Sequence, residues 1–158
     1  MSINFQPIAD VIEEMSVEGV GGIFLGNLQS VRDSAFLLKN KVTHILSVLP
    51  HYLYDAEEYS EVQVKTKIIT YDDSNLDQSL QYLMSEAADF IHEGSRTGNV
   101  LISCLAGLTR SPAFLIAYYI KYRNLTRDAA LSLLVAKTVL LKINREFFNQ
   151  LARFEDFW

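Results

Sequence analysis

At 158 residues, the chain is long enough to fold as one domain around a substantial hydrophobic core. Hydrophobic residues make up 49% of the chain and charged residues 21%, which is typical of a globular domain and excludes an intrinsically disordered one. The net charge is −5 and there is no stripe of basic and aromatic residues, so we expect no nucleic-acid partner.

Cysteine content and hydropathy indicate the compartment. The single cysteine, Cys104, excludes an internal disulfide and fits a reducing environment. No apolar run is long enough to span a membrane, and Met1-Ser2-Ile3-Asn4 does not begin a secretory signal. We therefore expect a cytoplasmic and/or nuclear protein with no membrane partner.

Charge is unevenly distributed along the chain. Residues 1–103 hold 6 Lys and Arg against 15 Asp and Glu, whereas residues 104–158 hold 8 against 4. The C-terminal part is therefore basic and favours an anionic ligand. Each of its helical cations is also expected on an ordinary solvated face; these are Lys121, Arg123, Arg127 and Arg153.

The hydrophobic pattern alternates strands and helices without repeats or linkers. Strands are expected over 19–27, 43–49, 62–70 and 100–102, and a polar segment over 51–61. Helices are expected over 31–39, 78–93 and 111–122, followed by a helix capped by Thr126 and a last helix capped by Asn144; the lead-in over 1–19 allows a further short helix. The helix over 31–39 is expected to be capped by Ser30 and to turn Val31, Ala35 and Leu38 inward.

The run over 43–49 is continuous, apolar and β-branched, as in a strand buried on both faces of a parallel sheet. Strands that alternate with helices predict an α/β fold. We therefore predict a single domain over 20–158, with a central, mostly parallel sheet flanked by helices. Such sheets bind ligands beyond the carboxyl ends of their strands.

The stretch from Val100 to Pro112 combines an apolar strand, a short loop and the start of a helix. This turn directs backbone N–H groups and the positive end of a helix dipole toward one cavity, which favours an anion. A thiolate at Cys104 would be stabilised there and become nucleophilic. The Arg110 fork can bind two phosphate oxygens at once, and Gly107 lets the backbone pass close to them. The alternative is a buried inert thiol beside a surface arginine.

Cys104 and Arg110 separated by five residues, with Gly107 between them and Ser111 after them, resemble the signature of cysteine-dependent protein tyrosine phosphatases. The likeness is closest to the dual-specificity branch. It extends over about residues 20–157, because the pattern from Asn144 to Glu155 is similar to the C-terminal helix of that branch.

Cleavage of a phosphate monoester by a thiolate needs a nucleophile, stabilisation of the phosphoryl oxygens and a proton for the leaving group. Cys104 supplies the first. The resemblance implies Asp73 as general acid, with Asp72 as the alternative, and Ser111 as stabiliser of the departing thiolate. The predicted phosphate-binding residues are Leu105, Ala106, Gly107, Leu108, Thr109 and Arg110.

One residue departs from the family pattern. The family has histidine before the cysteine, and this chain has Ser103. A serine donates a hydrogen bond but carries no charge, so we expect a higher Cys104 pKa and slower turnover. This departure keeps open a pseudophosphatase that binds phosphoproteins. The third alternative is another Cys–Arg enzyme, such as a sulfurtransferase or an arsenate reductase.

The expected substrate is a phosphorylated protein, carrying phosphotyrosine or phosphoserine and phosphothreonine. Phosphoinositide-directed relatives carry lysines inside the loop, whereas this loop is neutral between Cys104 and Arg110. The chemistry needs no cofactor and no metal. His44, His51 and His92 show no ligand spacing, and His44 is expected as a satisfied core residue.

Overall fold

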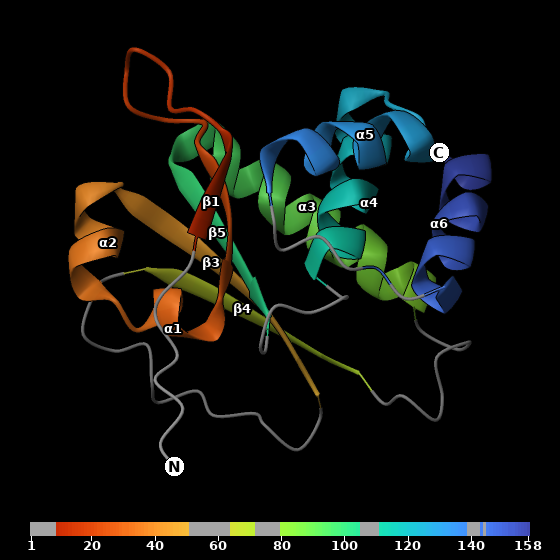
Figure 1. The fold of residues 1–158 in the computed structure, drawn as a ribbon, viewed down its shortest axis with the longest axis horizontal. Coiled ribbons are helices and arrows are strands. Elements are labelled where there is room, and N and C mark those ends of the chain that lie inside the picture. Colours follow the sequence, from red (N-terminus) through yellow and green to blue (C-terminus); the bar gives the residue numbers. More distant parts are fainter. Residues whose placement is uncertain (1–8, 51–63, 72–79, 105–110, 139–142, 144) are drawn as a thin grey trace.

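The computed structural model describes residues 9–50, 64–71, 80–104, 111–138, 143 and 145–158 (Figure 1). The elements are β1 (Ala9–Glu13), β2 (Ile23–Asn27), α1 (Leu28–Val31), α2 (Ser34–Lys39), β3 (Val42–Pro50), β4 (Lys65–Tyr71), α3 (Leu80–Thr97), β5 (Asn99–Cys104), α4 (Ser111–Arg123), α5 (Arg127–Lys137) and α6 (Arg145–Phe157).

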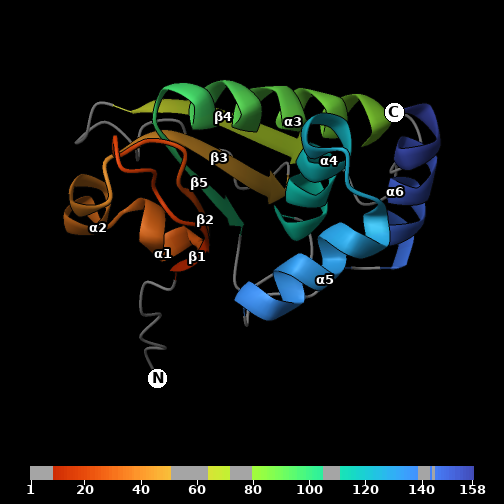
Figure 2. The ribbon, with the colours of Figure 1, turned by 90° about the horizontal axis from the view of Figure 1, so that it is seen from above.

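The strands form one sheet in the order β1-β2-β5-β3-β4. β5 pairs in parallel with β2 and β3, and β3 pairs in parallel with β4, whereas β1 is antiparallel to β2. Helices α1 and α2 pack on one face of the sheet, and α3 to α6 cover the other (Figures 1 and 2). The predicted α/β fold with a mostly parallel central sheet is confirmed.

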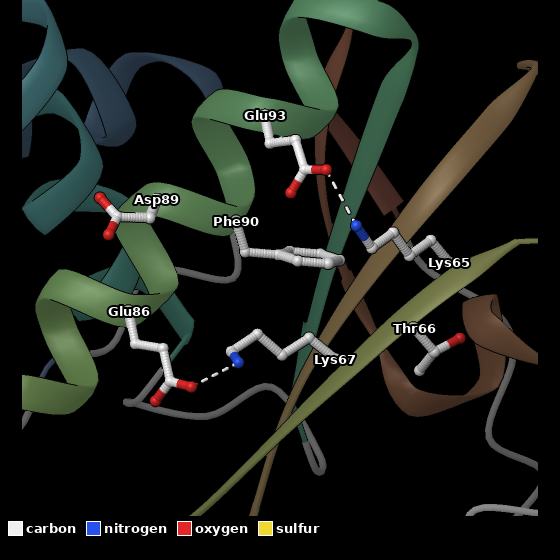
Figure 3. A pocket seen from close by; sticks show the side chains of 7 residues that line it. All are labelled: Lys65, Thr66, Lys67, Glu86, Asp89, Phe90 and Glu93. Carbon is white, nitrogen blue, oxygen red and sulfur yellow. Dashed lines mark hydrogen bonds and ion pairs between the residues drawn. The ribbon is translucent and has the colours of Figure 1, made fainter.

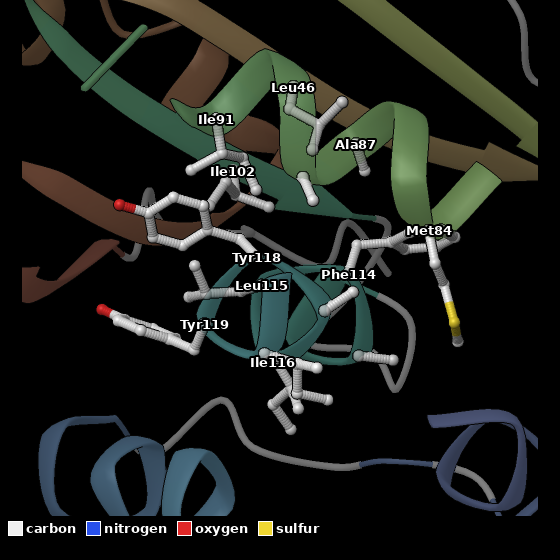
Figure 4. Close-up of a cluster of buried hydrophobic side chains, with 14 of the residues drawn as sticks. Leu46, Met84, Ala87, Ile91, Ile102, Phe114, Leu115, Ile116, Tyr118 and Tyr119 are labelled. Atoms are coloured by element: carbon white, nitrogen blue, oxygen red, sulfur yellow. The ribbon is translucent and has the colours of Figure 1, made fainter. Parts of the chain in front are cut away.

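The larger core lies between the sheet and α3, α4 and α6 (Figure 4). α4 is buried almost all round, since every residue from Ala113 to Ile120 is at most 5% exposed. Burying a large apolar side chain contributes about 1.5–3 kcal/mol. The continuous apolar run after Pro112 therefore makes α4 the central helix of the domain and fixes the position of its first turn.

The N-terminal part differs from the predicted lead-in helix. Ala9–Glu13 forms strand β1, which pairs with β2 and covers an edge of the sheet that would otherwise expose its backbone groups. Glu13 accepts hydrogen bonds from the Tyr119 hydroxyl at 2.9 Å and from the Arg123 guanidinium at 3.1 Å. β1 is therefore tied to α4 by a carboxylate, an interaction that local periodicity does not report.

The predicted helix over 31–39 is wrong in its cap and in part of its inner face: Val31 is buried as predicted, whereas Ala35 and Leu38 are exposed. Two short helices occupy this segment, capped by Asn27 and by Asp33, and the Ser30 hydroxyl donates to the Asn27 carbonyl at 2.6 Å. The break shifts the helical phase, so Leu37 is buried while Leu38 is 67% exposed.

The later elements agree better with the prediction. The Thr126 hydroxyl accepts a hydrogen bond from the Ala129 N–H at 3.1 Å, which confirms it as the cap of α5. The predicted cap Asn144 and the segment 51–61 lie outside the described residues. His44 is 8% exposed, and its Nδ1 lies 2.7 Å from the Thr43 hydroxyl, so the predicted satisfied core histidine is confirmed.

Candidate active site

The carboxyl ends of the four parallel strands lie along one edge of the sheet. In the register, Cys104 of β5 is flanked by Asn27 of β2 and by Val48 of β3, and the last residues of β3 and β4, Pro50 and Tyr71, are paired with each other. This is the edge at which parallel sheets bind ligands. The predicted nucleophile therefore ends the central strand at the expected place.

Cys104 is the last residue of β5, and Ser111 is the first residue of α4. The backbone N–H groups of the first turn of a helix have no intrahelical partner, so they stabilise an anion that binds at the helix N-terminus. The segment that joins the two elements holds the predicted phosphate-binding residues, Leu105, Ala106, Gly107, Leu108, Thr109 and Arg110, and lies outside the described residues. Their roles, and the role of Ser111, stay predictions.

The predicted general acid comes directly after β4, which lies on the other side of β3 from β5. β4 ends at Tyr71, and β3 separates it from β5. With strands about 4.8 Å apart, the ends of β4 and β5 are separated by roughly 10 Å across the sheet. Asp72 and Asp73 lie outside the described residues, and the choice between them stays a prediction. The topology does bring the chain before them to the same edge as Cys104.

Ser103, the residue that replaces the expected histidine, is completely buried. Its hydroxyl oxygen lies 3.3 Å from that of Ser47, which is also completely buried and is its register partner on β3. Sequence patterns alone did not identify Ser47. The signal that could have found it is a polar residue inside the otherwise apolar run over 43–49.

Charged side chains of β4 and α3 lie together away from this edge. They line a cavity of about 340 Å³ between the two elements (Figure 3). Lys65 is paired with Glu93 at 2.8 Å, and Lys67 with Glu86, so both cations are neutralised by carboxylates. This cavity therefore lacks the unpaired positive charge that a phosphate would need.

Buried His44 and Asp89 at the surface have shifted pKa values, but neither is in a position to take part in catalysis. Burial lowers the pKa of His44, which sits near the opposite end of β3 and is paired in register with Val100. Burial opposes ionisation of Asp89, but hydrogen bonds from Lys121 and Tyr122 outweigh it and lower the Asp89 pKa.

Within the described part of the chain, we find no cluster of three or more His, Cys, Asp or Glu side chains that could hold a metal ion. Over the same residues, no helix is both long enough and apolar enough to cross a bilayer.

Comparisons with known proteins agree with this geometry. The family model "Dual specificity phosphatase, catalytic domain" matches residues 23–157. Dual specificity protein phosphatase 22 from Homo sapiens is 36% identical over 135 residues, which cover 85% of this chain and 70% of that protein. MAP kinase phosphatase with leucine-rich repeats protein 3 from Dictyostelium discoideum is 30% identical over 154 residues, 95% of this chain but 17% of that protein.

Among solved structures, the crystal structure of DUSP15 matches with a TM-score of 0.73 at 26% identity and covers 86% of this chain and 84% of that one. The fold, with Cys104 at the end of β5 and α4 beginning at Ser111, matches that of the cysteine-dependent phosphatase class. The chain belongs to the dual-specificity phosphatase family, since the family model matches nearly all of it. The predicted family and enzyme class are confirmed, and the domain boundary at residue 20 stays a prediction.

Proposed function

We propose that this chain hydrolyses phosphotyrosine and phosphoserine or phosphothreonine in proteins through a cysteinyl-phosphate intermediate. The observation that carries the proposal is the position of Cys104, which ends the central parallel strand in a chain whose residues 23–157 match the dual-specificity catalytic domain. The start of α4 at Ser111 supports an anion site next to that cysteine.

In the first step, the Cys104 thiolate attacks phosphorus and the bond to the substrate oxygen breaks. Arg110 and the N–H groups of residues 105–110 bind the phosphoryl oxygens, and Asp73 gives a proton to the leaving oxygen. In the second step, water attacks phosphorus and gives a proton to the Asp73 carboxylate. The sulfur–phosphorus bond then breaks, the Ser111 hydroxyl stabilises the thiolate, and inorganic phosphate leaves.

A phosphoprotein is the favoured substrate class. The side chains between Cys104 and Arg110 carry no charge, so the loop lacks the extra cations that an inositol phosphate headgroup would engage. A reducing compartment, cytoplasmic or nuclear, suits a chain whose single cysteine is the nucleophile and has no partner thiol to repair it after oxidation.

The second candidate is a phosphoprotein-binding module with weak turnover. It is favoured by Ser103, which is buried, uncharged and hydrogen-bonded to Ser47, and therefore cannot supply the positive charge of an imidazolium. Both candidates use the same anion site. They differ only in how much of Cys104 is ionised at neutral pH.

Turnover separates the two candidates. We would assay a small aryl phosphate and a phosphopeptide with the wild type and with Cys104→Ser, and measure phosphopeptide binding to both. The catalytic proposal expects turnover by the wild type and none by Cys104→Ser. If the wild type is as inert as Cys104→Ser while both bind the phosphopeptide, the binding module is correct.

A further inference from the structure

An aromatic groove of about 430 Å³ lies between α3 and the end of α6, and none of its described walls belongs to the sheet. Its rings come from Tyr82 of α3, Phe157 of α6 and Trp158, which follows α6. These side chains are 68%, 78% and 51% exposed, and among the described residues no other Phe, Tyr or Trp is exposed to this degree. Single exposed apolar side chains are ordinary, but exposed rings gathered around a hollow mark an interaction surface.

Contacts within the protein hold the aromatic groove in its shape. Trp158 packs against the buried ring of Phe154 and against Phe157, with ring centroids 6.0 and 5.0 Å apart. The backbone N–H of Trp158 donates to the Phe154 carbonyl at 3.1 Å, and the Lys121 ammonium lies 4.2 Å from the centre of the Trp158 ring. A ligand would therefore meet side chains that are already ordered, which lowers the entropy cost of binding.

The charge of the aromatic groove is positive. Its one charged wall residue in the described chain is Arg153, which is exposed and has no hydrogen-bond or ion-pair partner within that part of the chain. Lys121, next to the Trp158 ring, is already held by Asp89 at 2.6 Å. No described carboxylate lines the groove, so its electrostatic potential favours a negatively charged ligand.

The neutral polar groups of the groove fit a peptide. Lys121 donates to the Ser85 oxygen at 2.9 Å, and because an ammonium can only donate, the Ser85 hydroxyl keeps its own proton for another acceptor. The exposed Tyr82 phenol is a second donor. Gln81 spends its side-chain N–H₂ on the backbone and side-chain oxygens of Gln150, at 2.8 and 3.0 Å, so its own oxygen can accept a peptide N–H.

We propose that the aromatic groove binds a segment of a partner protein in which Asp or Glu stands next to a large apolar residue. The apolar side chain packs between the rings of Tyr82, Phe157 and Trp158, and the carboxylate pairs with Arg153. A basic segment would be repelled, and a purely apolar one would leave the guanidinium without a partner. The concave shape and the amide acceptor favour a peptide over a flat lipid surface. The site does not use Cys104, so the proposal is independent of the proposed function.

Trp158 is the only tryptophan of the chain, so its fluorescence reports directly on the groove. We would titrate the full chain with the peptide acetyl-Ala-Glu-Leu-Phe-Asp-Ala-amide and with the same peptide carrying Gln and Asn in place of its acids. The acidic peptide should change the emission and saturate below about 1 mM. The neutral peptide, or Arg153→Gln in the protein, should each raise Kd about three- to tenfold, and the two changes together should raise it no further.

Arg145→Gln is the matched control, because Arg145 is an exposed arginine at the other end of α6. It should leave Kd unchanged, and so should Cys104→Ser. Phe157→Ala, at an exposed position, should raise Kd about tenfold without loss of stability. Circular dichroism and thermal unfolding of each variant show that the fold is kept.

Three results would overturn the proposal: no saturable change with the acidic peptide, equal Kd for the acidic and neutral peptides, or an equal loss in Arg145→Gln. Vesicles of phosphatidylserine and phosphatidylcholine that change the emission of Trp158 when the peptide does not would assign the groove to a lipid surface instead. An emission that changes with protein concentration alone would assign it to a second copy of the chain. Peptide binding by a wild type with no turnover would refute the catalytic proposal and leave this one standing.

Discussion

The two ends of β5 are built in opposite ways. At its amino end, Asn99 is fully buried and its amide N–H₂ lies 3.0–3.1 Å from the carbonyl oxygens of Gly19, Asn40 and Lys41, while its Oδ1 accepts from the Gly22 N–H at 2.7 Å. At its carboxyl end, the Ser103 hydroxyl makes a single hydrogen bond of 3.3 Å within the described residues, to the Ser47 hydroxyl.

This difference suggests that the amino end of β5 serves the stability of the fold and that its carboxyl end serves the chemistry of the site. At the amino end, the Asn99 side-chain amide joins two loops and a neighbouring turn to the sheet. A buried polar group stabilises a fold when its hydrogen bonds are satisfied in this way. The carboxyl end has few fixed partners and leads into the candidate phosphate site. We therefore expect substitutions at the amino end to change the free energy of unfolding, and substitutions at the carboxyl end to change rates.

The largest effect should come from the predicted general acid. Asp73→Asn removes the proton donor to the leaving oxygen and should lower kcat about 10²–10⁴-fold toward phosphopeptides, with the unfolding free energy nearly unchanged. Asp72→Asn is the matched control and should keep kcat within a few-fold. If Asp72→Asn loses the activity and Asp73→Asn does not, the acid is Asp72.

The next effect should be on stability at the amino end. Asn99→Leu removes the amide from its five described hydrogen-bond partners and leaves buried carbonyls unpaired, so we expect a loss of about 3 kcal/mol in unfolding free energy. Denaturant unfolding measures this loss. Asn149→Leu, on an exposed position of α6, should change stability by less than about 0.5 kcal/mol. If Asn99→Leu is as stable as the wild type, or if it lowers kcat in the folded fraction, the amino end of β5 does not have the purely stabilising role assigned to it.

A smaller effect is expected from restoring the family residue. Ser103→His brings an imidazole next to Cys104, and it should move the acid limb of the pH–rate profile to lower pH by about one unit. The site is fully buried, so the larger side chain should also cost about 1–3 kcal/mol of stability. A profile that does not move would refute the explanation based on the Cys104 pKa.

The smallest effect is the pH dependence of stability from His44. Burial lowers its pKa in the folded state, with a further lowering by Lys65 opposed by Glu93, so the unfolded chain binds the proton more tightly. His44 therefore destabilises the fold as pH falls below about 6.5, the ordinary histidine pKa. The unfolding free energy of the wild type minus that of His44→Asn should decrease from pH 8 to pH 5. A constant difference over this range would contradict it.

Much of the fold could be predicted because its decisive segments carry strong local signals. The runs over 43–49 and 100–102 are apolar on both faces, and α4 is apolar all round, so each could take only one place in an α/β domain. The position of Cys104 followed from the strand before it and the helix after it.

The rest depended on contacts between distant residues. β1 is a strand because β2 offers an open edge and because Glu13 reaches Tyr119 and Arg123 of α4. The pair of Ser47 with Ser103 arises from the register of β3 against β5, which no short-range pattern fixes. The segment divides into α1 and α2 because Asn27 and Asp33 each cap a short helix, whereas the sequence pattern predicts Ser30, which lies inside α1, as the cap of a single helix.

The most direct test of the phosphatase account is to trap the phosphorylated cysteine. We would mix the wild type with a phosphopeptide substrate, quench the reaction with acid during turnover and digest the protein. Mass spectrometry then gives the mass of the proteolytic peptide that contains Cys104. The account predicts a peptide heavier by one phosphoryl group in the wild type, and more of it in a variant with slowed hydrolysis such as Ser111→Ala. Phosphate release without any phosphoryl group on Cys104, or equal release by Cys104→Ser, would contradict it.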